Sequence, residues 1–282
     1  MFEALRKEWQ AKVATAVFLI YTAFWLVLLL LPEKETIYHY LFTDTYAVLA
    51  FWGGLWGFVI SQKWGFAKSL VGKAILMFSL GLFAQVFGQL AYSFYAYYLH
   101  TEVPYPSIGD LGYFGSIPLY IYGVITLAKA SGVKIFSPIS IKRGINFTGK
   151  LGILLISIIV PVGMLLASYL LFLKGYEFDF SQPLTIFLDF GYPFGEAIYI
   201  SLAILTYLLS RKVLGGIMRV RILFILFALL VQFIADYMFL YRASRGLWYA
   251  GGPNDYTYFL AYFIMTLALL ELNTVYNRIK DE

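Results

Sequence analysis

The segment LGILLISIIVPVGMLLASYLLFL, residues 151–173, runs for 23 residues without a charged side chain. A helix needs about 20 consecutive apolar residues to cross a hydrocarbon core about 30 Å thick. Seven other stretches share this character, although the second and fourth are shorter. The predicted spans cover residues 11–31, 46–61, 74–99, 111–127, 151–173, 184–209, 222–241 and 256–272.

In lipid, only helices and closed barrels satisfy every backbone hydrogen-bonding group. The sequence therefore predicts an all-α fold, a polytopic transmembrane bundle of about eight helices. The connections between the spans are short, and the longest, residues 128–150, is basic. We expect a single membrane domain over residues 1–282.

The composition excludes a water-soluble globule, since 61% of the residues are hydrophobic and only 13% are charged. A net charge of +5 would suggest nucleic acid in a soluble domain. Here we assign the charge to the segments between spans, where it attracts anionic lipids, and we predict membrane lipids but no nucleic acid as partners. The absence of cysteine excludes disulfides, thiol catalysis and cysteine-ligated metals.

The basic residues alternate between the two ends of the predicted spans. Seventeen of the 21 Lys and Arg residues fall in the terminal segments and in every second connection, and four fall in the remaining connections. Segments rich in Lys and Arg stay on the cytoplasmic side. The sequence thus predicts a multi-pass protein of the cell membrane with both termini in the cytoplasm.

A short motif recurs at the outer starts of the even-numbered spans. Residues 110–113 (DLGY) return as residues 189–192 (DFGY), and residues 255–258 (DYTY) form a weaker third copy. Repetition of this kind indicates a repeated structural unit. We expect helical hairpins repeated in parallel orientation, with the last six helices forming a pseudo-symmetric ring or bundle.

Polar residues in these spans lie at helical spacing. Asp189, Tyr192, Glu196 and Tyr199 follow one face of the sixth span, while Gln89 lies in the third and Asp236 in the seventh. Acids inside a membrane cost free energy, and they normally face a partner, a wet cavity or the bundle interior. We predict an outward-open pocket with Glu196 at its floor and these six residues as ligand contacts. Carboxylates among aromatic side chains favour a cation or a polyhydroxylated molecule, and a lipid can also enter from the side.

Several of the polar residues have structural alternatives. Ser107 and Asp110 fit a helix-capping box, and Asp189 suits a helix N-terminus. Glutamines in membrane helices often link helices to one another. For Asp236 the chief alternative is a salt bridge to Arg242 or Arg245, and for Glu196 the sequence offers no simple structural role.

Catalytic and cofactor signals are weak. His39 and His100 lie near Asp44 and Glu102, but their spacing does not define a metal site. The sequence contains no nucleophile–histidine–acid order, phosphate-binding loop or paired-aspartate motif for magnesium diphosphates. We therefore predict no cofactor and no metal, and we favour a non-enzymatic protein.

Residues 104–113 (PYPSIGDLGY) and 189–193 (DFGYP) resemble motifs of a prokaryotic sensor module. This module is the multi-helix membrane region found N-terminal to diguanylate cyclases and some histidine kinases. The resemblance covers about residues 74–272 and extends to acids at the positions of Glu196, Asp236 and Asp255. It implies a sensory membrane domain, here without an output domain, so any signal would pass to a cytoplasmic partner at the basic loop 129–150.

The leading hypothesis is a receptor-like membrane protein that binds a small molecule or lipid at its outer face. A proton-coupled solute transporter is the alternative, because acids within spans and internal repeats also occur in transporters. A membrane enzyme acting on lipid, with Glu196 as acid or base, is the third.

Overall fold

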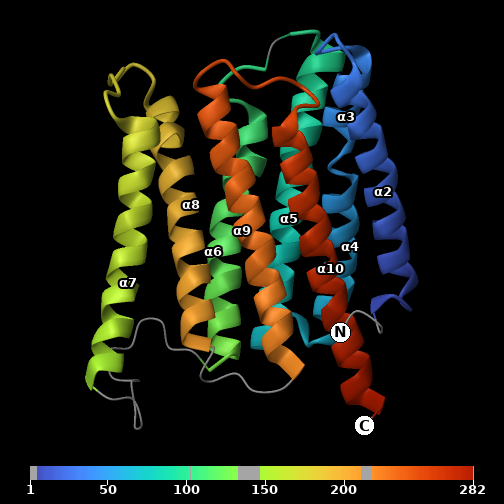
Figure 1. Ribbon diagram of the computed structural model, residues 1–282, viewed down its shortest axis with the longest axis vertical. Helices are drawn as coiled ribbons and strands as arrows, with labels where there is room; N and C mark the ends of the chain where they lie inside the picture. Colours follow the sequence, from blue (N-terminus) through green and yellow to red (C-terminus); the bar gives the residue numbers. More distant parts are fainter. Residues whose placement is uncertain (1–4, 102, 133–146, 211–216, 282) are drawn as a thin grey trace.

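The computed structural model describes residues 5–101, 103–132, 147–210 and 217–281. Within these ranges the chain is helical and contains no β-strand, which confirms the all-α part of the predicted fold class (Figure 1). The α-helices are α2 (Trp9–Leu30), α3 (Ile37–Thr45), α4 (Val48–Lys63), α5 (Leu70–Phe94), α6 (Ile108–Ala130), α7 (Phe147–Ser168), α8 (Pro183–Ser210), α9 (Ile217–Ala243) and α10 (Pro253–Asp281). Short helical turns η1 (Phe66–Lys68), η2 (Tyr95–Leu99) and η3 (Tyr169–Leu173) adjoin them.

Each predicted span corresponds to one long helix, with two differences. The short helix α3 precedes α4, and α10 continues past residue 272 to Asp281 with Arg278 and Lys280 in its last turn. Basic side chains at that position interact favourably with the helix dipole. Five helices in the described part of the chain are long and apolar enough to cross a membrane, whereas α4 has only 16 residues. Most of the basic loop 129–150, the predicted partner contact, lies outside the described residues.

Six helices form a closed ring in the order α4, α5, α6, α8, α9 and α10, and α10 packs back against α4. Helix α2 lies outside the ring against α10, and α7 lies outside it against α8 (Figure 1). The prediction that the last six helices form the ring is therefore wrong for one position, because α4 replaces α7. The described side chains of α7 are apolar apart from Ser168 at its end, and Ile159 and Val162 are exposed, as lipid-facing residues are.

Glycines explain why α4 can enter the ring. A side chain at Gly57 would meet Ser79 of α5 and would lie 2.9 Å from Leu269 of α10. Between α5 and α6 the two backbones themselves meet, since a Cβ at Gly112 would lie 2.5 Å from the backbone nitrogen of Gly88. Small residues of this kind allow membrane helices to pack backbone to backbone.

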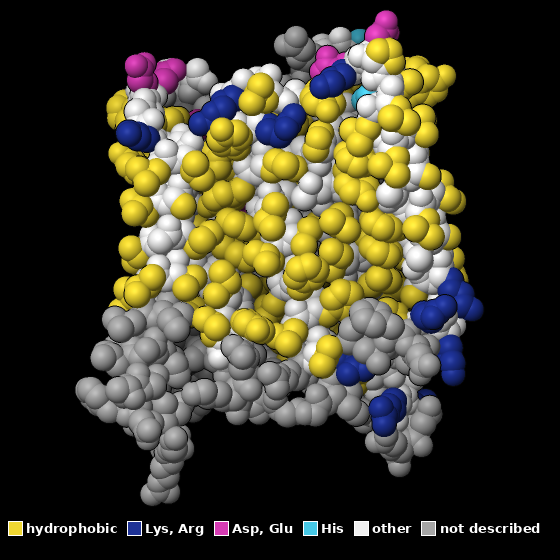
Figure 2. Space-filling view, in the orientation of Figure 1, with side chains coloured by type: hydrophobic (Ala, Val, Ile, Leu, Met, Phe, Trp, Pro, Cys, Tyr) yellow, Lys and Arg dark blue, Asp and Glu magenta, His cyan; other side chains and the backbone are white. Residues whose placement is uncertain are grey.

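The surface of the bundle fits a membrane environment. Figure 2 shows a broad apolar band across the face in view, with acidic side chains at its upper end. At the opposite end of the ring, Arg221 of α9 forms a 2.7 Å ion pair with the fully buried Glu271 of α10. The starts of α6, α8 and α10 all lie at the upper end in Figure 1, and so do the copies of the repeated motif.

Candidate ligand-binding cavity

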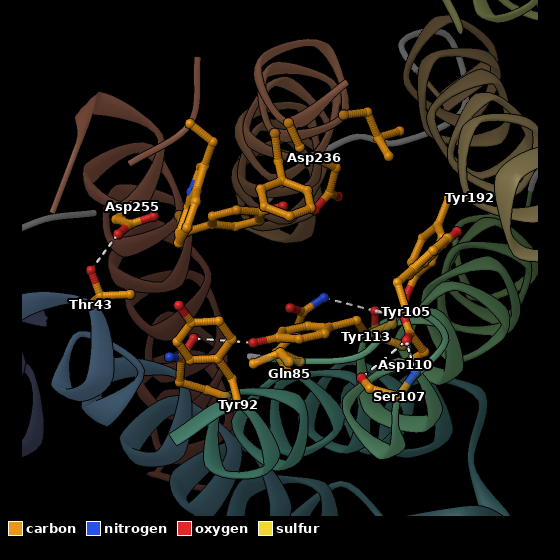
Figure 3. Close-up of a pocket in the computed structure, with 18 of the residues that line it drawn as sticks. Thr43, Gln85, Tyr92, Tyr105, Ser107, Asp110, Tyr113, Tyr192, Asp236 and Asp255 are labelled. Carbon is orange, nitrogen blue, oxygen red and sulfur yellow. Dashed lines mark hydrogen bonds between the residues drawn. The ribbon is translucent and has the colours of Figure 1, made fainter. Parts of the chain in front are cut away.

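A cavity of about 670 Å³ lies inside the ring at the end where α6, α8 and α10 begin. Its walls come from α3, α5, α6, α8, α9 and α10 and from the connections before α6 and α10 (Figure 3). Ligand sites for small molecules commonly have volumes of about 300–1,000 Å³. The cavity extends from exposed residues such as Tyr105 down to the buried Glu196.

The cavity is strongly acidic. Five carboxyl side chains line it, and the described residues around it include no Lys, Arg or His. These acids are Asp110, Asp189, Glu196, Asp236 and Asp255. Seven tyrosines share the walls with them: Tyr46, Tyr92, Tyr105, Tyr113, Tyr192, Tyr258 and Tyr262.

Asp110 caps α6 and also links α6 to α8. Its Oδ2 accepts a 2.7 Å hydrogen bond from the Ser107 backbone nitrogen, and Ser107 Oγ accepts from the Gly109 nitrogen, which confirms the predicted capping box. The Tyr192 hydroxyl donates to Asp110 Oδ1 at 2.7 Å. This aspartate is therefore a structural group whose charge nevertheless faces the cavity.

Asp189 holds two connecting segments at the rim of the cavity. It accepts hydrogen bonds from the hydroxyls of Tyr105 at 2.8 Å and Tyr176 at 2.7 Å. Burial, together with the bond to Asp189, raises the pKa of Tyr105 well above its ordinary value. The bond to Asp189 also raises the pKa of Tyr176. Both phenols thus keep their protons and act as donors to the carboxylate.

Asp236 is bound by neutral donors. Its Oδ1 accepts from Gln232 Nε2 at 3.0 Å, and its Oδ2 accepts from the Tyr199 hydroxyl at 3.2 Å. The predicted alternative, a salt bridge to Arg242 or Arg245, is wrong. Arg242 donates to the Leu247 carbonyl, and Arg245 stacks on the Tyr241 ring at 3.8 Å.

Asp255 at the start of α10 connects that helix to α3. Its Oδ2 accepts from Thr43 Oγ1 at 2.6 Å and from the Gly251 backbone nitrogen at 2.9 Å. The side chain is 2% exposed, and Figure 3 shows the Thr43 bond at one side of the cavity. The third copy of the repeated motif thus also begins with a hydrogen-bonded aspartate.

Glu196 differs from the four aspartates. Its side chain is only 3% exposed and lines the cavity, yet its Oε2 has no hydrogen-bond partner among the described residues. Tyr199 lies one turn further along α8, but its hydroxyl donates to Asp236 instead. A buried polar atom without a partner costs about 1–3 kcal/mol, and an uncompensated charge costs more.

Gln85 and Gln89 join the helices of the wall, as the structural alternative predicted, whereas Gln232 donates to Asp236 of its own helix α9. Gln85 of α5 donates to Ser116 Oγ of α6 at 2.8 Å and accepts from the Tyr262 hydroxyl of α10 at 3.1 Å. Gln89 accepts from the Tyr113 hydroxyl of α6 at 3.1 Å. Their hydrogen bonds fix the tyrosines that face the cavity.

Five of the six predicted contact residues line the cavity, namely Gln89, Asp189, Tyr192, Glu196 and Asp236. Tyr199 does not, because it is fully buried behind Asp236 and packs edge-to-face against Tyr120. Sequence reasoning missed Thr43 and Tyr105 as site residues. Thr43 lies in a short helix that apolar periodicity did not reveal, and Tyr105 lies in a connection, where no helical spacing applies.

The histidines lie apart from the cavity lining. His39 is buried with its Nδ1 2.8 Å from Thr36 Oγ1, and His100 is exposed at the end of η2. Within the described ranges, no three His, Asp or Glu side chains are grouped so that they could hold a metal ion. Comparison with protein-family models, curated proteins and solved structures finds no match for this chain.

Proposed function

We propose that this chain is a receptor-like integral membrane protein that binds a small molecule in the acidic cavity. The observation that carries the proposal is Glu196, a buried carboxyl group that faces a cavity of ligand size and lacks a partner for Oε2. Costly groups of this kind are retained where they serve a site, and a polar ligand would supply the missing interaction.

Several helices line the cavity, so a bound ligand could change how these helices are arranged. Its lining comes from helices around the ring, so a bound molecule would contact α5, α6, α8, α9 and α10 together. A ligand changes the helix arrangement only if it binds one arrangement better than another. We propose that the cavity faces outward, and that the resulting shift reaches a cytoplasmic partner through the helix ends and the basic loop 129–150. The resemblance of the motifs to sensor regions agrees with this assignment.

Transport of a solute is the competing function. Inward from Glu196, Val124, Ala203 and Leu229 are buried in the described core of the ring, and the charged side chains Arg221 and Glu271 at its far end are paired with each other. The hydroxyls of Ser201 and Thr206 in this region donate to carbonyls of their own helix. These features favour a closed binding site over a continuous polar path.

The test uses the full chain purified in detergent. A panel of neutral polyols, amines and lipid headgroups is screened for compounds that raise the unfolding temperature of the wild type. We expect the shift to disappear in Glu196→Gln and to persist in Glu177→Gln, which alters an exposed acid outside the cavity. Shifts that are equal in both variants would contradict the cavity assignment.

The receptor step needs a separate measurement. The chain has no native cysteine, so a single Lys68→Cys variant can carry a fluorophore at the end of the bundle opposite the cavity. We expect a stabilising compound to change the fluorescence, and the change to be absent in the Glu196→Gln background. Uptake of the compound into proteoliposomes without that change would favour a transporter.

A further inference from the structure

The charge of the cavity indicates the chemical class of its occupant. The five carboxyl groups line one cavity without a basic side chain among its described lining residues. Acidic walls of low dielectric concentrate the field, which attracts cations and repels phosphates and carboxylates. Carboxyl groups without basic neighbours therefore favour a cationic ligand over an anionic one.

Glu196 defines where the positive charge would lie. The four aspartates already accept hydrogen bonds from hydroxyl, amide or backbone donors. Glu196 Oε2 has no such donor among the described residues, and the residue is only 3% exposed. An ammonium group would provide both hydrogen-bond donors and the missing countercharge.

The rest of the wall suits the body of an organic cation better than a metal ion. Tyr113, Tyr192 and Tyr258 line the cavity, and aromatic faces attract ammonium groups. A volume of about 670 Å³ is far larger than a single metal ion requires. Among the described side chains, the acids are not grouped as metal ligands.

We infer that the molecule held in this cavity is an organic ammonium ion, with its charged nitrogen against Glu196 and its apolar body along the tyrosines. This inference rests on the proposed function and adds the class of ligand. A neutral polyol would satisfy the proposed function but not this inference, because it does not supply the countercharge.

The test compares molecules of matched shape that differ in charge. The purified full chain is titrated with benzylamine and benzyl alcohol, and with putrescine and butane-1,4-diol. Choline and its neutral isostere 3,3-dimethylbutanol form a third pair that tests the charge alone, because a quaternary ammonium has no N–H donor. Binding is measured by calorimetry and by the shift in unfolding temperature. We expect at least one ammonium compound to bind and its neutral counterpart to bind at least about tenfold more weakly.

Variants locate the contact. Glu196→Gln keeps the shape but removes the charge, and it should weaken binding of the ammonium compound by about tenfold or more. Glu196→Asp keeps the charge and should retain the preference for the ammonium member of each pair. Glu177→Gln serves as the matched control and should leave affinity unchanged. Size-exclusion profiles and ligand-free unfolding temperatures show that each variant is folded.

Three outcomes would overturn the inference. The first is that neutral isosteres bind as well as the amines. The second is that amines still bind to a folded Glu196→Gln variant. Failure of every ammonium compound to bind would also overturn it. If neutral polyols alone stabilise the wild type and lose that effect in Glu196→Gln, the proposed receptor site stands and only the ligand class is wrong.

Discussion

The hydroxyl of Tyr192 on α8 donates to Asp110 Oδ1 on α6 at 2.7 Å, while Asp110 Oδ2 caps the start of α6. One carboxylate thus fixes a helix terminus and a helix–helix contact at the wall of the cavity. Both residues belong to the repeated motif, in which an aspartate is followed three residues later by a tyrosine. The tyrosine of the second copy binds the aspartate of the first, so the motif pairs across helices.

Because Asp110 makes both interactions, its removal should lower the stability more than removal of either partner, Tyr192 or Ser107. Tyr192→Phe should cost about 1 kcal/mol for the lost hydrogen bond, and Ser107→Ala a similar amount for the lost cap. Asp110→Ala should cost more than either, because it removes both interactions. Reversible unfolding in mixed detergent measures these values, with Tyr122→Phe, at an exposed tyrosine of α6, as the control. Additive effects of Tyr192→Phe and Asp110→Ala would contradict the contact.

The close approach of α5 and α6 predicts contrasting effects of two glycine substitutions on one helix. A Cβ at Gly112 would meet the Ala84 carbonyl oxygen and the Gly88 nitrogen, and backbone atoms cannot move aside as a flexible side chain can. Gly112→Ala should therefore destabilise the protein by about 1–3 kcal/mol or more. At Gly115 no described atom of another helix lies within 4 Å of the added Cβ, so Gly115→Ala should be tolerated. Equal unfolding temperatures for the two variants would show that the helices are not in this contact.

The different surroundings of two cavity acids predict opposite responses to the same chemical change. Asp236→Asn should lower stability by about 1 kcal/mol, because its carboxylate accepts from both Gln232 and Tyr199. Glu196→Gln should leave ligand-free stability unchanged or raise it, since it replaces a buried acid with a neutral amide at a position that lacks a partner. Unfolding temperatures without added ligand measure both. A loss at Glu196→Gln as large as that at Asp236→Asn would mean that Glu196 has a structural partner.

The distribution of basic residues predicts which end of the bundle faces the outside of the cell, and the labelling of single cysteines can test this prediction. Ser181→Cys, in the connection before α8, should react with a membrane-impermeant maleimide in intact cells. Lys68→Cys, at the opposite end of the bundle, should react only after permeabilisation. The cysteine-free wild type provides the background. The reverse pattern would invert the topology and place the cavity on the cytoplasmic side.

Hydropathy and local motifs predicted the helices because these features depend on near neighbours in the chain. An apolar stretch such as residues 151–173 is helical in lipid whatever surrounds it. The Ser107–Asp110 capping box is equally local, and it was predicted correctly. The whole of α3 and the end of α10 were missed because their polar and amphipathic residues give no span signal.

The sequence by itself determined the helical class of the protein, the positions of its long helices and the acids that most needed an explanation. Helical spacing placed Tyr192, Glu196 and Tyr199 on one face, but it could not show where along that face the cavity ends. Only the tertiary structure decided that α4 closes the ring in place of α7, that Tyr199 donates to Asp236 from the packed core, and that Glu196 Oε2 is left without a donor. These outcomes depend on which helix surfaces fit together and which donors are already used, and both are properties of residues far apart in the chain.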